Sequence, residues 1–141
     1  MKAGEKGHAA VVRELLQRGA DANAHDNDGW TALHSASYNG RAEAMRELLM
    51  HRPNINAQNN SGHTPLMCAC DAGHLMAATL LIGHAADLAL LDNAGHSALF
   101  WAENRLRQDA APPAAGDEAV SPALREEHKS IVNLLKAHGA T

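Results

Sequence analysis

The chain has 141 residues, a formal net charge of -4 and few aromatic side chains, and its length fits a single domain. Twelve basic residues against sixteen acidic ones argue against nucleic acid or anionic lipid as the main partner. No apolar run approaches the roughly 18 residues that a membrane span needs, and the N-terminal residues lack the apolar stretch of a signal peptide. We therefore expect a soluble protein of the cytoplasm.

A period of 33 residues runs through the chain. It relates three sets of residues: Gly7, Gly40 and Gly73; Gly29, Gly62 and Gly95; and Leu15, Leu48 and Leu81. A fixed period of this length indicates a repeat architecture, in which each unit buries its apolar side against its neighbours.

Each repeat is expected to contain two helices. The first should begin after a hydroxyl residue, because Thr31, Thr64 and Ser97 are favoured N-caps and Pro65 suits a first helical position. The second is expected over residues 9–17, 42–50 and 75–82. These helices should stop at Gly19 or at an equivalent break such as Pro53.

The aligned segments 28–36 (DGWTALHSA), 61–69 (SGHTPLMCA) and 94–102 (AGHSALFWA), with Gly73-His74 and residues 15–23 (LLQRGADAN), resemble the ankyrin repeat. The resemblance covers roughly residues 3–106 and 127–140. It implies an all-α solenoid of stacked helix-turn-helix units with short hairpin loops. The expected units are a partial N-terminal repeat (1–24), two repeats (25–57 and 58–90) and an interrupted C-terminal capping repeat (91–141).

The first unit is incomplete, since Ala3 aligns with Ala36 inside a first helix and no hairpin precedes it. Terminal repeats normally cap a solenoid with a polar outer face. We expect either a minimal helix that caps this end or a chain cut from a longer array.

The last unit is interrupted. Residues 131–140 align with residues 11–20 at an offset of 120 where an unbroken array needs 99, which indicates a 21-residue insertion near 107–127. The segment 110–122 holds three prolines and one glycine and is expected to be a loop. The helix before it should extend past its usual end, and Ser121-Pro122 should start a long outer helix that runs to Ala137. Together they predict a protruding helical hairpin.

Histidine and cysteine give little sign of a metal site or a catalytic site. His8, His74 and His128 share one repeat position and are expected to be structural. Cys68 and Cys70 lack the second ligand pair of a zinc site, so we expect reduced, packed thiols. No catalytic or nucleotide-binding motif is present. The chain is thus expected not to be an enzyme and to carry no metal or cofactor.

The resemblance implies a protein-binding site at the hairpin tips and at the exposed ends of the first helices. Carried over residue by residue, the expected contacts are Asn27, Asp28, Trp30, Tyr38, Asn39, Asn60, His63, Asp71, Asn93, His96, Asn104 and Arg105. Trp30 shares its position with His63 and His96 and is expected to be substantially exposed, with Tyr38 beside it. Phe100 and Trp101 are expected to fill volume where the insertion opens the last repeat.

These features predict a non-catalytic protein-protein interaction module with a rigid concave binding surface. Its partner is expected to be another protein, with no nucleic acid and no membrane, and the chain is expected to be a monomer unless it is part of a longer chain. Two alternatives stay open. The chain is a structural segment of a longer repeat array in a multidomain protein, or its histidines form a switch that responds to pH or metal.

Overall fold

The computed structural model describes residues 2–110 and 121–139, with side chains described for 9–109 and 121–139. The helices, in chain order, are α1 (Lys2–Gln17), α2 (Ala32–Tyr38), α3 (Ala42–Met50), α4 (Pro65–Ala72), α5 (Leu75–Gly83), α6 (Ala98–Ala110) and α7 (Pro122–Ala137). No strand is found within the ranges just given, so the all-α repeat fold is confirmed.

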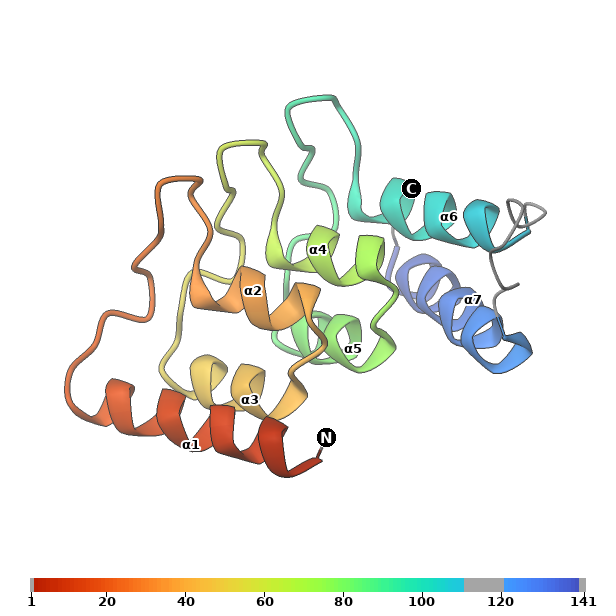
Figure 1. Ribbon diagram of the computed structural model, residues 1–141. Helices are drawn as coiled ribbons and strands as arrows, with labels where there is room; N and C mark the ends of the chain where they lie inside the picture. Colours follow the sequence, from red (N-terminus) through yellow and green to blue (C-terminus); the bar gives the residue numbers. More distant parts are fainter. Residues whose placement is uncertain (1, 111–120, 140–141) are drawn as a thin grey trace.

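The helices form two layers (Figure 1). The inner helices are α2, α4 and α6, in which α4 packs against both of the others. The outer helices are α1, α3, α5 and α7, each packed against the next. Contacts between α2 and α3, α4 and α5, and α6 and α7 join the layers. Three hairpin loops, at 18–31, 51–64 and 84–97, project from the helices on the same side of the molecule (Figure 1).

The predicted helix starts are confirmed. The Thr31 and Thr64 hydroxyls accept the backbone N–H of the residue three positions later, and Pro65 occupies the first turn of α4. Ser97 Oγ accepts the Phe100 N–H at 3.3 Å in the same way. Each hydroxyl satisfies an N–H that has no partner within its helix, which fixes where the helix begins.

The helix stops also follow the prediction. Gly19 follows α1 with a φ of 89°, in the left-handed region that glycine adopts readily. The equivalent residues Arg52 and Ala85 adopt φ values of 49° and 65° after α3 and α5. The turn is therefore kept in repeats that lack the glycine.

The three leucines that occupy one repeat position, Leu15, Leu48 and Leu81, differ in how deeply they are buried. Leu48 and Leu81 are 2% and 0% exposed and lie in the core between the layers, as the repeat pattern predicts. Leu15 is 53% exposed, whereas the next residue, Leu16, is buried.

The first helix differs from the expectation. Residues 2–17 form one continuous α-helix, so Ala3 belongs to the same helix as residues 9–17 and not to a separate first helix. Periodicity placed Ala3 by alignment, but the segment 2–17 holds no proline, and its Gly4 and Gly7 do not interrupt the helix.

The last two helices are longer than their equivalents in the two middle repeats, as predicted. The inner helix α6 has 13 residues against 7 in α2 and 8 in α4, and α7 has 16 against 9 in both α3 and α5. Ser121 caps α7, which ends at Ala137. A buried hydrogen bond between the Asp109 carboxyl group and the His128 ring joins the two helices. The predicted loop of the insertion falls largely on 111–120, outside the described residues.

None of the helices described in this chain combines the length and the apolar character that crossing a membrane requires.

Candidate functional site

Each hairpin is held by one acidic or amide side chain that recurs every 33 residues. Oδ1 of Asp26 accepts the backbone N–H groups of Asp28 and Trp30, both at 2.9 Å. Asn59 and Asp92 make the equivalent bonds to the residues two and four positions later, at 2.9–3.0 Å. This turn fixes the backbone at Trp30, His63 and His96 in the same place in each repeat. Its recurrence with the same period is a signal that sequence analysis missed.

Successive hairpins are hydrogen-bonded to each other. The Asn60 side-chain amide donates to the Asn27 carbonyl at 2.9 Å, and Asn93 donates to the Asn60 carbonyl at 2.9 Å. Backbone bonds from Asn60 to Asp28 and from Asn93 to Ser61, both 3.0 Å, run alongside. Four of these exposed residues were predicted to contact a partner: Asn27, Asp28, Asn60 and Asn93. Their amide groups connect the hairpins into a continuous surface.

Trp30 is partly buried, and the expectation that it is substantially exposed is wrong. Its ring lies 5.7 Å from that of His34 and 5.9 Å from that of Tyr38, the latter edge to face at 83°. The indole therefore packs on α2. Tyr38 is 46% exposed and lies beside Trp30, as predicted.

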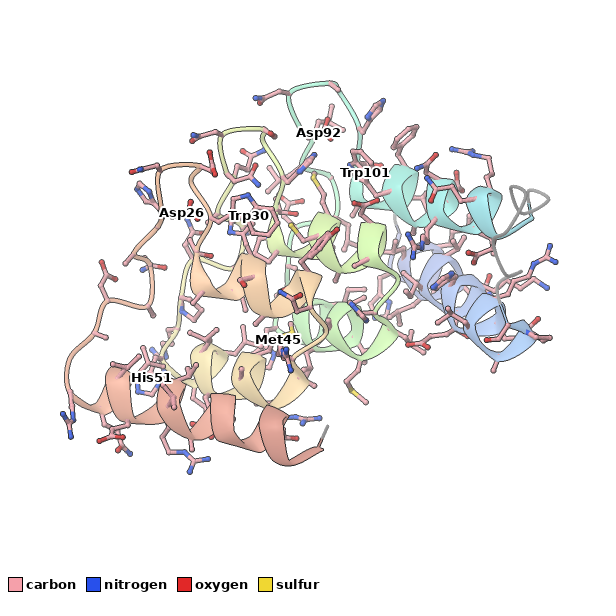
Figure 2. All side chains as sticks on the ribbon, in the orientation of Figure 1. Asp26, Trp30, Met45, His51, Asp92 and Trp101 are labelled. Carbon is pink, nitrogen blue, oxygen red and sulfur yellow. The ribbon has the colours of Figure 1, made fainter. Side chains whose placement is uncertain are left out.

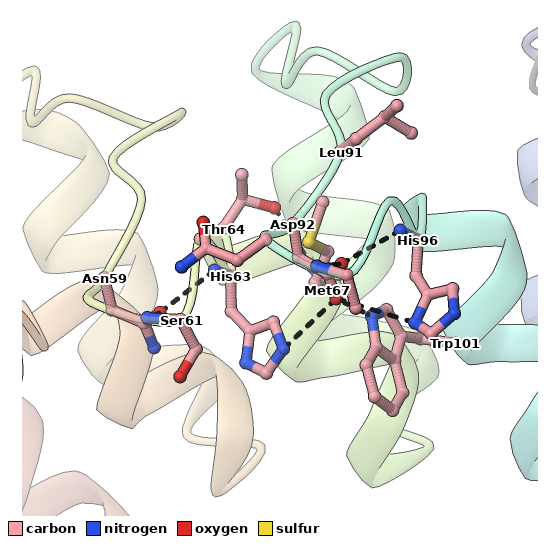
Figure 3. Close-up of polar contacts among 12 residues, drawn as sticks. Asn59, Ser61, His63, Thr64, Met67, Leu91, Asp92, His96 and Trp101 are labelled. Carbon is pink, nitrogen blue, oxygen red and sulfur yellow. Dashed lines mark hydrogen bonds and ion pairs between the residues drawn. The ribbon is translucent and has the colours of Figure 1, made fainter.

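A second group of rings surrounds the buried carboxylate of Asp92 (Figure 3). Asp92 Oδ2 accepts the Trp101 indole N–H at 3.0 Å and lies 3.3 Å from His63 Nε2. Burial opposes ionisation of this carboxyl, but hydrogen bonds from the His96 backbone and the Trp101 indole outweigh it and lower the pKa of Asp92. The Trp101 ring lies 5.3 Å from that of His63, at 80°.

The two groups of rings border one pocket with a volume of about 290 Å³. Its lining consists of Trp30, Tyr38, His63, Met67, Cys68, Asp71 and Trp101. Trp30 and Trp101 lie along the junction between the hairpins and the inner helices (Figure 2). We call this the aromatic pocket.

The aromatic pocket brings together four of the predicted contact residues. Trp30, Tyr38, His63 and Asp71 line it, although they come from two different repeats. Sequence analysis missed Met67, Cys68 and Trp101. Trp101 was expected only to fill volume, but it is partly exposed and lines the pocket.

The other predicted contacts lie outside the aromatic pocket. Asn39 follows α2, and its amide donates to the Ser35 carbonyl at 2.8 Å. His96 stacks on Phe100 with ring centroids 3.7 Å apart. Asn104 and Arg105 are partly buried on α6. Asn27, Asp28, Asn60 and Asn93 are at the hairpin tips.

Burial keeps the thiol of Cys68, which lines the aromatic pocket, protonated. Burial, reinforced by the nearby Asp71 carboxylate, raises the pKa of Cys68 to about 12, so its thiol is neutral at physiological pH. Burial likewise raises the pKa of Cys70. Both cysteines are free and buried, in agreement with the expected packing role.

His74 and His128, which were predicted to be structural, each pack against a glycine of a neighbouring repeat. A Cβ added at Gly40 would lie 2.7 Å from the His74 ring, and one added at Gly73 would collide with the His128 ring. Burial lowers the pKa of His74. The structural role is confirmed for His74 and His128, and the His8 side chain lies outside the described residues.

In the side chains that the structure describes, no group of three His, Cys, Asp or Glu residues is arranged to hold a metal ion.

A family model described as ankyrin repeats (3 copies) matches residues 1–92 and 43–111. The matched residues include all three hairpins, α2 and α4, and every residue of the aromatic pocket.

Proposed function

Since this chain belongs to the ankyrin-repeat family, we propose that it is a non-catalytic module that binds another protein. The proposed binding surface consists of the hairpins and the inner helices α2, α4 and α6. The observation that carries this proposal is the aromatic pocket at their junction. Trp and Tyr are enriched among the residues that dominate binding energy, and here two Trp and one Tyr line a single hollow.

The rigidity of this surface supports the proposal. The side chains of Asp26, Asn59 and Asp92 fix each hairpin, and the amides of Asn60 and Asn93 tie each hairpin to the one before it. A surface that is already ordered loses less conformational entropy when a partner binds. The mechanism is therefore recognition by a preformed row of side chains.

The proposed contacts are the residues inferred from the family pattern, with Trp101 added. Trp30, Tyr38, His63 and Asp71 are the proposed centre, because they line the pocket. Asn27, Asp28, Asn39, Asn60, Asn93, His96, Asn104 and Arg105 are the proposed periphery. The partner we propose is a protein and not nucleic acid or a membrane, which the net charge of -4 supports. We further propose a monomer in the cytoplasm, where two free thiols stay reduced.

Capture of a binding partner with matched variants tests the proposed surface. Tyr38→Ala and His63→Ala should each reduce the amount of a captured protein several-fold. Met76→Ala is the control, because Met76 is 52% exposed on the outer helix α5. A captured protein that is lost equally with Met76→Ala, or retained with both pocket variants, would contradict the proposed surface.

A second candidate function is a segment within a longer repeat array. The observation that favours it is the exposure of Val11 (56%) and Leu15 (53%), which are four residues apart on α1 and so share a face. A photo-crosslinker at position 15 tests it. Crosslinks to another segment with the repeat pattern would support the longer array. Quenching of the photo-activated group by water, with no crosslinked protein, would contradict it and leave the binding module as the proposed function.

A further inference from the structure

The aromatic residues of this chain are concentrated at one pocket and not in the core. The sequence contains two Trp, one Tyr and one Phe, and both Trp and the Tyr line the aromatic pocket. The largest fully buried side chains are Leu, Met, Ile and His. Trp30 comes from the first hairpin, Tyr38 from the end of α2 and Trp101 from the first turn of α6. Folding thus brings together three rings from separate elements at a partly open surface.

These rings are held in fixed orientations. The Trp30 backbone N–H is bonded to Asp26, and its ring meets Tyr38 at 83°. The Trp101 N–H donates to Asp92 at 3.0 Å, so a ligand meets the indole ring and not this donor. The rings are therefore in place before an occupant binds, and each aromatic ring carries a negative potential on its faces, to which a cation is attracted.

The charge of the lining is negative. Asp71 contributes a carboxylate, and neither Lys nor Arg is among the lining residues. Within the described part of the chain, Asp71 has no ion-pair partner within 4.0 Å. His63, the one lining residue that can become cationic, lies 3.3 Å from the Asp92 carboxylate. Met67 and Cys68, both buried, complete the lining with uncharged sulfur.

We propose that the aromatic pocket binds an alkylated ammonium group, presented as the side chain of a methylated lysine in the partner protein. The inference rests on the proposed function. A cation within about 6 Å of an aromatic ring centre is attracted by the negative face of the ring, most strongly for Trp. Methyl groups on the ammonium reduce its hydration, so it enters an apolar pocket at a lower cost than an unmodified lysine. The Asp71 carboxylate adds a complementary charge.

The size of the pocket agrees with this ligand. A volume of about 290 Å³ lies just below the range of roughly 300–1,000 Å³ found for small-molecule sites. It therefore suits one side chain rather than a nucleotide or a flavin.

Intrinsic fluorescence tests the proposal directly, because both tryptophans of the chain line the pocket. The wild-type protein is titrated with three acetylated and amidated single amino acids: trimethyllysine, lysine, and an uncharged isostere in which carbon replaces the quaternary nitrogen. We expect a saturable change with trimethyllysine and binding about tenfold weaker for the isostere, since a desolvated cation-π contact is worth roughly that much. Equal binding of the isostere, or no saturable change with trimethyllysine at millimolar concentration, would overturn the proposal.

Variants test the assigned residues. Asp71→Asn keeps the shape and removes the charge, and should weaken trimethyllysine binding about two- to fivefold, as for a partly exposed ion pair. Tyr38→Ala should weaken it further, whereas Met76→Ala should leave it unchanged. Undiminished binding by both pocket variants would overturn the assignment of the pocket.

The outcome is separable from that of the proposed function. If trimethyllysine does not bind, yet capture of a protein still depends on Tyr38 and His63, only the methyllysine inference fails. If trimethyllysine binds but no captured protein depends on these residues, the pocket stands and the proposed function fails.

Discussion

The carboxylate of Asp92 makes two kinds of contact. Oδ1 accepts the backbone N–H groups of Ala94 and His96 and so forms the turn of the third hairpin. Oδ2 accepts the Trp101 indole N–H and so orients a wall of the aromatic pocket. Asn59 forms the same turn in the second hairpin with an amide, so the turn alone does not need a carboxylate. The additional contact with the Trp101 indole does need a carboxylate, because an amide offers only one acceptor oxygen.

We predict that Asp92→Asn lowers the free energy of unfolding by about 1–3 kcal/mol at neutral pH, because it removes the charged acceptor of a partly buried N–H. Asp26→Asn is the matched control and should change it by less than about 0.5 kcal/mol, since Asp26 forms a turn that Asn59 already forms with an amide. Urea denaturation at pH 7 measures both. Equal effects of the two substitutions would contradict the assigned role of Oδ2.

The effect of Asp92→Asn should depend on pH. Because the folded state lowers the pKa of Asp92, its ionised form stabilises the fold above the unfolded pKa of about 3.9, and this contribution is lost as the pH falls through the lower, folded value. The difference in stability between wild type and Asp92→Asn should therefore shrink as the pH falls below about 4. A difference that grows as the pH falls from about 4 to 2 would reverse the assigned sign.

Glycine at position 73 is required for two reasons. Its φ is +76°, and the space where a Cβ would lie is occupied by the His128 ring. We predict that Gly73→Ala lowers the free energy of unfolding by about 2–4 kcal/mol, from left-handed strain and overpacking together. Gly95→Ala is the control, with a φ of +81° but nothing within 4 Å, and should cost only about 1–2 kcal/mol. Thermal or urea unfolding measures the difference between the two losses in free energy of unfolding. Equal losses would mean that the His128 ring moves aside to make room for the new Cβ.

At the scale of the helices, burial depends on which neighbours a helix has. Leu81→Ala in α5 should lower the free energy of unfolding by about 2–5 kcal/mol, because it leaves a cavity among fully buried side chains. Leu15→Ala, at the same repeat position in α1, should change it by less than about 0.5 kcal/mol, because Leu15 is 53% exposed. Denaturation of the two variants checks this, and a Leu15→Ala cost as large as that of Leu81→Ala would show that α1 packs differently.

Local signals in the sequence were enough to predict most helix boundaries. Thr31, Thr64 and Ser121 cap helices through hydroxyl contacts three residues away, and such contacts depend only on the nearby chain. The repeat period also predicted which residues recur at the hairpins. The continuous α1 was missed because alignment to a repeat does not reveal whether a segment joins the helix that follows it.

The candidate site was predicted only in part, for a different reason. Trp30 was placed correctly at the end of the first hairpin, but its burial depends on the rings of His34 and Tyr38 that lie against it. Trp101 was missed because its partner Asp92 is in another element, nine residues earlier. The repeat period identifies equivalent positions in successive repeats. It does not predict the contacts that different residue types make between adjacent repeats.

For the whole molecule, charge predicts a solubility minimum. The sequence isoelectric point is about 6.2, so the net charge of the chain passes through zero near that pH. We predict that solubility at low salt is lowest near pH 6 and rises on either side, because the loss of net charge removes repulsion between molecules. Turbidity measured from pH 5 to 7.5 checks this. Turbidity that does not vary over this range would contradict it.

The walls of the aromatic pocket come from three successive repeats, with Trp30 and Tyr38 from one, His63 and Asp71 from the next and Trp101 from the last. In a linear array each unit contacts only its neighbours, so units at an end open more easily than those in the middle. A ligand that touches all three walls binds only while the three units are stacked, and it therefore opposes the separate opening of α6 and α7. Occupancy of one small pocket would make the array unfold more nearly as a single cooperative unit.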